Sequence, residues 1–470
     1  MSDLRRSTPA AQGVDAGGID AFLAALAPMA GVEVHSLMVL RHGRVVAERW
    51  WRPYRPDAPH LLYSLSKSFS STALGFAVAE GLVDLDATVL SYFPEFDARV
   101  TDPRSRSTRV RHVAAMASGH AQDMLDRAIQ AGAGDMVLGL LMLPPEYEPG
   151  THFAYNQPCT NALSAIIQRV SGGSLTEFLR PRLFEPLDIH PYGWWRDPVG
   201  RDAGYSGLHA PTEAIAKLGQ LYLDGGVWRG ERLLPAAWVA EATRSHVDTG
   251  GEGNPDWRVG YGFQFWRGRH GYRGDGAYGQ FMVILPEADA VVAMTSQSPD
   301  MQGVLDRMWT HLLPALTVDS GPAGPWPAAS PALSGPAGDG SAGPIVAATY
   351  RPGPDNAIDA LREVRIRPGR LVLADSDELA DSDELADSDE LADSDELAVP
   401  LGDADGGWTA GGAVATAHAW AGGMLLIDVI FTETPHRLHL ALDPAGTFTA
   451  RWQTPPLYGG PLSGLRMPRR

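Results

Sequence analysis

The sequence of 470 residues predicts an α/β (α+β) fold, an antiparallel sheet flanked by helices, followed by a small all-β domain. Strand-like apolar runs lie near both ends of residues 1–318, and the pattern between about 83 and 250 is mostly helical. This order predicts a sheet built from both ends of that segment, with an inserted helical subdomain and a cleft between the two parts. A Gly-, Pro- and Ala-rich linker at 319–344 leads into residues 345–470, whose short strand-like runs predict the second domain.

The first elements are a helix over about residues 18–27 and a β-hairpin. Two apolar runs, 36–41 and 44–51, flank a His-Gly dipeptide that favours a tight hairpin turn. The stretch from Ser64 to about Glu80 is rich in buried-type side chains and is predicted to form the next helix.

Strands return at the far end of the first domain. Residues 281–285 and 290–295 are apolar runs joined by a four-residue turn, and a helix over about 301–316 closes the domain. The second domain contains further strand-like runs, at 361–366, 424–431, 437–442 and 447–452.

The net charge of −18 comes mostly from a repeat. Asp-Ser-Asp-Glu-Leu-Ala occurs four times over 375–398, with three acids and no base in each copy; removing those twelve negative charges from −18 leaves −6. Identical tandem copies favour a duplication within a solvated loop over a calcium-binding or protein-docking tract. A remaining charge of −6 gives no reason to expect a nucleic-acid partner.

The sequence also bears on location and cofactors. The N-terminus lacks an apolar signal-peptide core and no stretch of about 18 apolar residues occurs, so we expect neither export nor membrane insertion. The single cysteine, Cys159, rules out an intramolecular disulfide and fits a cytoplasmic protein. Because no His-Glu-x-x-His or clustered Cys/His spacing occurs, we expect neither a metal nor another cofactor. The oligomeric state stays open.

Lysine is almost absent from the chain: of 38 basic residues only Lys67 and Lys217 are lysines. Lys67 follows Ser64 by three residues on the predicted helix, so the two side chains lie one turn apart on one face. A desolvated lysine can lose its proton near neutral pH, which guanidinium cannot do. The motif predicts a serine nucleophile with a lysine base; an N-capping serine followed by a solvated lysine is the structural alternative.

Three further segments bear on a catalytic site. Tyr155 lies in the loop 152–157, before an amphipathic helix at about 162–170, and could serve in catalysis or in packing. The glycine-rich segment 271–280 leads into a strand, where glycines either let the strand edge approach a ligand or mark a bulge. We interpret 116–120 as a structural helix end.

Taken as a set, these motifs resemble those of the class C β-lactamase, penicillin-binding-protein and family VIII carboxylesterase group of serine hydrolases. The resemblance covers about residues 7–318 and rests on Ser-Leu-Ser-Lys at 64–67, Tyr155, the 274–280 segment and Gly207-Leu208-His209. It implies a β-lactamase-like fold and an acyl-enzyme mechanism, with Ser64 as nucleophile, Lys67 as base or proton relay, and Tyr155 protonating the leaving group. It also implies an oxyanion hole formed by the backbone N–H groups of Ser64 and Ala277.

The identity of the base is left open by the sequence. Lysine and tyrosine have unperturbed pKa values of about 10.4 and 10, so either must be shifted to act as a base at neutral pH. Burial lowers the pKa of a lysine, and a neighbouring ammonium lowers that of a tyrosine. We therefore treat Lys67 and Tyr155 as one coupled unit.

Two candidate substrate-binding motifs depart from the β-lactamase pattern. Gln157 stands where an asparagine is usual, and Gly274-Asp275-Gly276 replaces Lys-Thr-Gly. An acid there repels a β-lactam carboxylate, although Arg273 offsets it. We expect weak or no β-lactamase activity and a small ester or amide substrate, and we interpret Asp275 as favouring one that bears an amine.

Two other functions stay open. One is a D-aminopeptidase or penicillin-binding-type peptidase, which the expected cytoplasmic location disfavours. The other is a catalytically silent, ligand-binding member of the fold with the β-rich domain as its effector. Retention of Ser64, Lys67 and Tyr155 together argues against silence.

Overall fold

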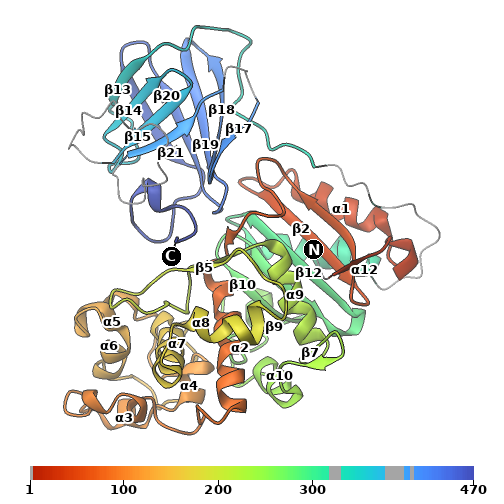
Figure 1. Ribbon diagram of the computed structural model, residues 1–470, viewed down its shortest axis with the longest axis vertical. Coiled ribbons are helices and arrows are strands. Elements are labelled where there is room, and N and C mark those ends of the chain that lie inside the picture. The colour runs from red at the N-terminus through yellow and green to blue at the C-terminus, as the bar shows by residue number, and fades with distance from the viewer. Residues whose placement is uncertain (1–3, 317–325, 327–329, 376–395, 403–406, 470) are drawn as a thin grey trace.

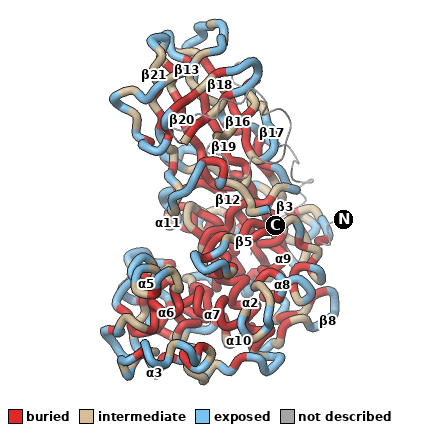
Figure 2. Tube along the Cα trace, turned by 60° about the vertical axis from the view of Figure 1, so that its left-hand side comes forward, coloured by how far each residue is buried: buried red, intermediate tan, exposed pale blue. Residues whose placement is uncertain are grey.

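The chain contains two large sheets, which lie in its first and last parts (Figure 1). The structure is a computed structural model, and the residues it describes are 4–316, 326, 330–375, 396–402 and 407–469. Buried residues concentrate in the central strands of both sheets and in the helices beside the first (Figure 2). The α/β fold with a C-terminal all-β region, predicted from the sequence, is confirmed.

The first sheet has seven strands and is antiparallel except for its first pair. In spatial order the strands are β1 (Arg5–Arg6), β3 (Arg44–Trp50), β2 (Glu33–Arg41), β12 (Ala290–Gln297), β11 (Gln280–Leu285), β10 (Gly271–Gly276) and β9 (Trp266–Gly268). The predicted hairpin is β2 and β3; His42 and Gly43 form its turn with φ angles of 51° and 67°. The N- and C-terminal segments of residues 1–318 thus meet at the β2–β12 pair.

Helices cover both faces of this sheet. On one face, α1 (Ala16–Leu26), α11 (Met301–Arg307) and α12 (Leu313–Ala315) enclose one hydrophobic core, with a π-helical turn, Met308–Leu312, between the last two. On the other face, α2 (Ser66–Ala79) and α9 (Thr212–Leu223) pack against the alternate residues of the same strands.

The inserted subdomain is mostly helical, as predicted. Its helices are α3 (Pro103–Ser107), α4 (Val110–Ala114), α5 (Leu125–Ala131), α6 (Met136–Met142), α7 (Gln157–Ser171), α8 (Leu175–Leu179) and, after α9, α10 (Ala236–Thr243). Its short strands are β5 (Gly193–Trp194), β6 (Leu208–Ala210), β7 (Val227–Trp228) and β8 (Glu231–Arg232). β6 lies between β5 and β4 (His60–Leu61), which precedes the subdomain, and β7 pairs with β8. The predicted helix at 162–170 is part of α7.

The second sheet has nine strands and is barrel-like, with one apolar core inside. In spatial order they are β16 (Glu396–Pro400), β15 (Arg370–Ala374), β14 (Glu363–Arg367), β13 (Ala348–Pro352), β21 (Thr447–Trp452), β20 (Arg437–Leu442), β19 (Met424–Phe431), β18 (Val414–Ala421) and β17 (Thr409–Gly411). The acidic repeat follows β15, and its last three residues, 396–398, belong to β16 and so are not loop as predicted; residues 376–395 lie outside the described part of the chain.

Hydrogen bonds and an ion pair join the β-rich domain to the first domain. Arg437 Nη1 lies 2.7 Å from Glu33 Oε2, and Leu61 N donates to Glu433 O at 2.8 Å. The described part of the predicted linker also contacts the first domain, because Arg52 N donates to Pro331 O at 2.8 Å. The division at 318 and 345 stays a prediction. Among the described residues, no helix is long and apolar enough to span a membrane.

Candidate active site

Ser64 and Lys67 lie at the start of the buried helix α2. The 3₁₀ turn Tyr63–Leu65 holds Ser64 and runs directly into α2. Lys67 Nζ and Ser64 Oγ lie 3.1 Å apart, within hydrogen-bond distance, as the spacing of three residues predicts. Tyr63, just before the serine, has a φ of 47°, a left-handed conformation that costs energy for a tyrosine and is typical of functional sites.

Lys67 is almost fully enclosed, with 1% of its surface exposed. Besides Ser64, its Nζ contacts Gln157 Oε1 at 2.6 Å and the carbonyl oxygen of Tyr205 at 2.8 Å. Burial lowers the pKa of Lys67 to about 7, although Asp123 and Asp275 oppose that shift. The solvated lysine that the sequence left as an alternative is not what the structure shows.

Tyr155 completes the group. Its ring centroid lies 4.7 Å from Lys67 Nζ, and Ser64 is close enough to act on the pKa of its hydroxyl. The ring stacks on Trp266, with centroids 5.4 Å apart. Burial raises the pKa of Tyr155, and Asp275 raises it further, so the lowering that a neighbouring ammonium would cause does not prevail.

The glycine-rich strand β10 lies directly against the nucleophile turn. A Cβ atom at Gly276 would stand 2.0 Å from the carbonyl oxygen of Leu62, and one at Gly274 would stand 2.3 Å from Ser68 Oγ. Backbone therefore leaves no room for a side chain at Gly276, whereas at Gly274 the obstacle is the packed side chains of Ser68 and Leu65. The turn after β10 contains Ala277, whose carbonyl accepts a hydrogen bond from Gln280 Nε2 at 3.0 Å.

Asp275 is buried and already paired. Its Oδ2 lies 2.8 Å from Arg273 Nε, and both side chains are enclosed. Burial raises the pKa of Asp275, while Arg273 opposes that change. A substrate amine would have to compete with Arg273 for this carboxylate. Gln157 is also engaged, since Lys67 holds its side-chain oxygen.

Sequence reasoning missed three residues around the site. Asp123 is exposed and favours the charged form of Lys67 by raising its pKa. Its side chain also accepts a hydrogen bond from Gln157 N at 2.9 Å. Tyr205 contributes a backbone oxygen, which no side-chain motif could reveal. Tyr458, from the β-rich domain, lies with its ring 6.3 Å from that of Tyr205.

The segment 116–120 and Trp194 have structural roles. His120 hydrogen bonds through Nδ1 to Ser118 and through Nε2 to Leu143 O, in agreement with a structural segment at 116–120. Trp194 is buried and donates to Ser206 O at 2.8 Å. No group of three or more His, Cys, Asp or Glu side chains that could hold a metal occurs among the residues described.

Comparison with known proteins identifies the family. The family model described as Beta-lactamase matches residues 19–316, so the chain belongs to the beta-lactamase family. It is 28% identical over 308 residues to 6-aminohexanoate-dimer hydrolase of Paenarthrobacter ureafaciens, covering 60% of this chain and 77% of that protein. It is 26% identical over 160 residues to lovastatin esterase of Penicillium rubens, covering 29% of this chain and 40% of that esterase.

One solved structure is similar over nearly the whole chain. The octameric penicillin-binding protein homologue from Pyrococcus abyssi covers 90% of this chain and 98% of its own, with a TM-score of 0.52 and 16% identity. This likeness concerns fold alone, and it extends beyond the family segment into the β-rich domain. The resemblance to this group of hydrolases inferred from the sequence is confirmed.

Proposed function

We propose that the protein is a serine hydrolase that cleaves small ester or amide substrates through an acyl-enzyme intermediate. The observation that carries this proposal is the contact of Lys67 Nζ with Ser64 Oγ at 3.1 Å, in a site where burial lowers the lysine pKa to about 7. A neutral amine beside a serine hydroxyl is the arrangement that nucleophilic catalysis needs. The hydrolase and esterase relatives support the same reaction class.

In the proposed first step, Ser64 Oγ attacks the substrate carbonyl carbon and its proton passes to Lys67 Nζ. The resulting oxyanion is held by the backbone N–H groups of Ser64 and Ala277, the roles that family resemblance assigns to them. Collapse of the tetrahedral intermediate breaks the bond to the leaving group, which takes a proton from the Tyr155 hydroxyl. The proton on Lys67 then restores Tyr155.

Water hydrolyses the acyl-enzyme in a second round of the same two proton transfers. Lys67 accepts a proton from the water, whose oxygen attacks the acyl carbon, and Ser64 Oγ leaves with a proton returned through Tyr155. Because burial raises the pKa of Tyr155, it suits the role of proton donor and Lys67 that of base. The product is the free acid.

The two altered anchors support an ester or amide over a β-lactam. The side-chain oxygen of Gln157 accepts a hydrogen bond from Lys67. Asp275, which pairs with Arg273, stands where the threonine of Lys-Thr-Gly is usual. Neither offers a free cation for a drug carboxylate. We expect hydrolysis of p-nitrophenyl butyrate and little or none of nitrocefin.

A labelling experiment tests this function. The protein is incubated with a fluorophosphonate probe and separately with p-nitrophenyl butyrate and short amides, and Ser64→Ala is compared. We expect covalent labelling and turnover in the natural protein and neither in Ser64→Ala. If the folded natural protein is neither labelled nor active, the silent, ligand-binding alternative is favoured instead.

A further inference from the structure

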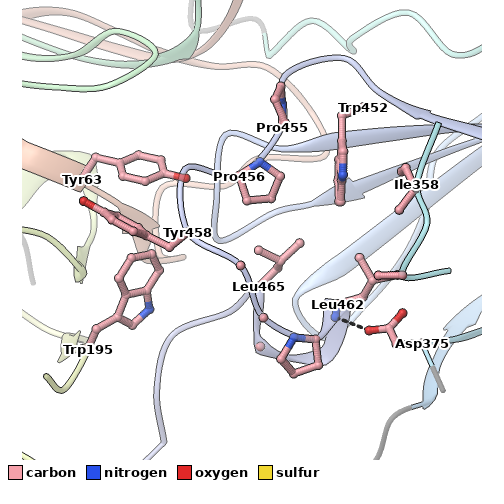
Figure 3. A pocket seen from close by; sticks show the side chains of 15 residues that line it. Tyr63, Trp195, Ile358, Asp375, Trp452, Pro455, Pro456, Tyr458, Leu462 and Leu465 are labelled. Carbon is pink, nitrogen blue, oxygen red and sulfur yellow. Dashed lines mark hydrogen bonds between the residues drawn. The ribbon is translucent and has the colours of Figure 1, made fainter. Parts of the chain in front are cut away.

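A cavity of about 440 Å³ lies between the nucleophile turn and the β-rich domain. Tyr63 and Trp195 of the first domain form one side (Figure 3). Ile358, Trp452 and Leu465 of the β-rich domain line the other side. Its volume lies in the range of small-molecule sites, about 300–1,000 Å³.

The cavity borders the catalytic group through Tyr63 and Tyr458. Tyr63 immediately precedes Ser64 in the chain, and the ring of Tyr458 lies between Tyr63 and Trp195 in Figure 3. The centroid of Tyr458 is 6.3 Å from that of Tyr205, whose carbonyl oxygen accepts from Lys67. Tyr458 also contributes to raising the pKa of Tyr155. Tyr63 and Tyr458 thus form the wall of the cavity nearest the proposed reaction centre, and Ser64, Lys67 and Tyr155 are not among the described residues that line it.

Hydrogen bonds fix this wall in place. His436 Nδ1 faces the carbonyl oxygen of Thr454 at 3.0 Å and so carries a proton, which leaves Nε2 to accept from the Tyr63 hydroxyl at 2.6 Å. Burial lowers the pKa of His436 to about 4, so the ring is neutral at neutral pH. Tyr278 donates to Pro455 O at 2.6 Å, which binds the loop before Tyr458 to the first domain. The site is formed before any ligand arrives.

The lining selects apolar groups. Aromatic and aliphatic side chains line the space, and among the described residues of the lining Asp375 alone is charged; it lies at the end away from Tyr63 (Figure 3). Its Oδ2 accepts a hydrogen bond from Leu462 N at 2.7 Å. Transfer of an alkyl chain or aromatic ring from water into such a space is favourable in free energy, whereas transfer of a charged group is unfavourable.

We propose that this cavity binds an extended apolar group of the substrate, an alkyl chain or aromatic ring attached to the ester or amide that Ser64 attacks. The inference rests on the proposed function and adds to it the substrate class. It also gives the β-rich domain a role, because that domain supplies most of the wall.

Chain-length preference tests the proposal. We compare kcat/KM for p-nitrophenyl acetate and octanoate in the natural protein, in Gly464→Phe, which adds a ring to the lining, and in Leu465→Asp, which adds a charge. A Cβ atom at Gly464 would meet only Pro461, at 3.8 Å, so the fold tolerates the substitution. Gly253→Phe is the matched control, since nothing lies within 4 Å of a Cβ there.

We expect the natural protein to prefer octanoate and both cavity variants to lose about tenfold on octanoate, because each excluded methylene forfeits its transfer from water. The loss on acetate should be smaller than that on octanoate, and all activities of Gly253→Phe should stay within about twofold of the natural protein. If esters are hydrolysed through Ser64 but the octanoate-to-acetate ratio is the same in every variant, the cavity proposal is overturned and the proposed function stands.

A binding measurement separates the two proposals. Octanamide, whose alkyl chain is on the acyl side as in octanoate, is titrated calorimetrically into Ser64→Ala and into Ser64→Ala combined with Gly464→Phe. We expect binding to the first and its loss in the second. If no ester or amide is hydrolysed, the proposed function fails and this titration alone decides the cavity; absence of binding to Ser64→Ala then overturns it.

Discussion

The side chain of Lys67 has three partners, and their chemistry suits a neutral amine. Gln157 Oε1 and the Tyr205 carbonyl oxygen can only accept hydrogen bonds, whereas the Ser64 hydroxyl can also donate one. A neutral lysine has two N–H donors and one lone pair. Two donors satisfy the two carbonyl oxygens, and the lone pair then faces the hydroxyl proton of Ser64.

Lys67→Arg should therefore abolish ester hydrolysis while keeping the positive charge. A guanidinium group cannot accept the serine proton, and loss of a general base costs about a hundred- to ten-thousandfold in rate. The control is Lys217→Arg at the other lysine, which is also buried and donates to Asp188 O at 2.8 Å. Initial rates with p-nitrophenyl butyrate measure both; a Lys67→Arg variant near natural activity would show that Lys67 only pairs charge.

The pH profile should follow the ionisation of Lys67. Because its pKa is lowered to about 7 and the neutral amine is the active form, kcat/KM should fall as pH drops below about 7. Asp123 favours the ammonium form, so Asp123→Asn should lower the lysine pKa and move this acidic limb to lower pH. Asp97→Asn, at an exposed acid paired with Arg106, should leave the limb in place. If the acidic limb of Asp123→Asn instead moves to higher pH, its assignment to Lys67 is contradicted.

Among the elements, those with strong local patterns were predictable. The β2–β3 hairpin, α2 and the β11–β12 pair occur close to their predicted bounds, because alternation, helical spacing and turn residues act within a few positions. The Ser64–Lys67 contact follows from the same local geometry. The contact of Gln157 with Lys67 depends on how α7 packs beside α2, and no spacing in the sequence determines that packing.

The fit of β10 against the nucleophile turn gives a prediction for Gly276. In Gly276→Ala the new methyl group would stand 2.0 Å from the Leu62 carbonyl oxygen, so β10 or the turn must move. We expect a loss of about 1–3 kcal/mol in the free energy of unfolding, the usual cost of overpacking, together with reduced turnover. Gly253→Ala has open space at its Cβ and serves as control. Urea denaturation measures the difference; equal stability of the two variants would show that the contact relaxes freely.

The arrangement of the whole molecule is where sequence reasoning was least informative. Tyr458 stands near the candidate site although 394 residues separate it from Ser64, and its approach depends on docking of the β-rich domain. The patterns of 345–470 predict strands but contain no signal for the surface they present. The contact between the two domains involves buried polar groups from both of them. Only the folded structure shows which of these groups meet.

An ion pair between Arg437 and Glu33 links the two domains. Substitution of Arg437 therefore tests the contact between them. Arg437 lies 2.7 Å from Glu33 of the first domain and 2.6 Å from Asp428 of its own, and all three side chains are largely enclosed. Burial alone would raise the pKa of Glu33, but His35 and Arg437 together lower it.

Arg437→Gln should destabilise the protein by about 3–5 kcal/mol, because Glu33 and Asp428 lose the cation that compensates their buried charge. Arg55→Gln breaks an exposed pair with Asp57 and should cost less than about 1 kcal/mol. Urea denaturation followed by tryptophan fluorescence gives both values, and the octanoate-to-acetate ratio shows whether Arg437→Gln also disturbs the cavity wall. Equal stability losses in the two variants would mean that the Arg437 pair does not hold the domains together.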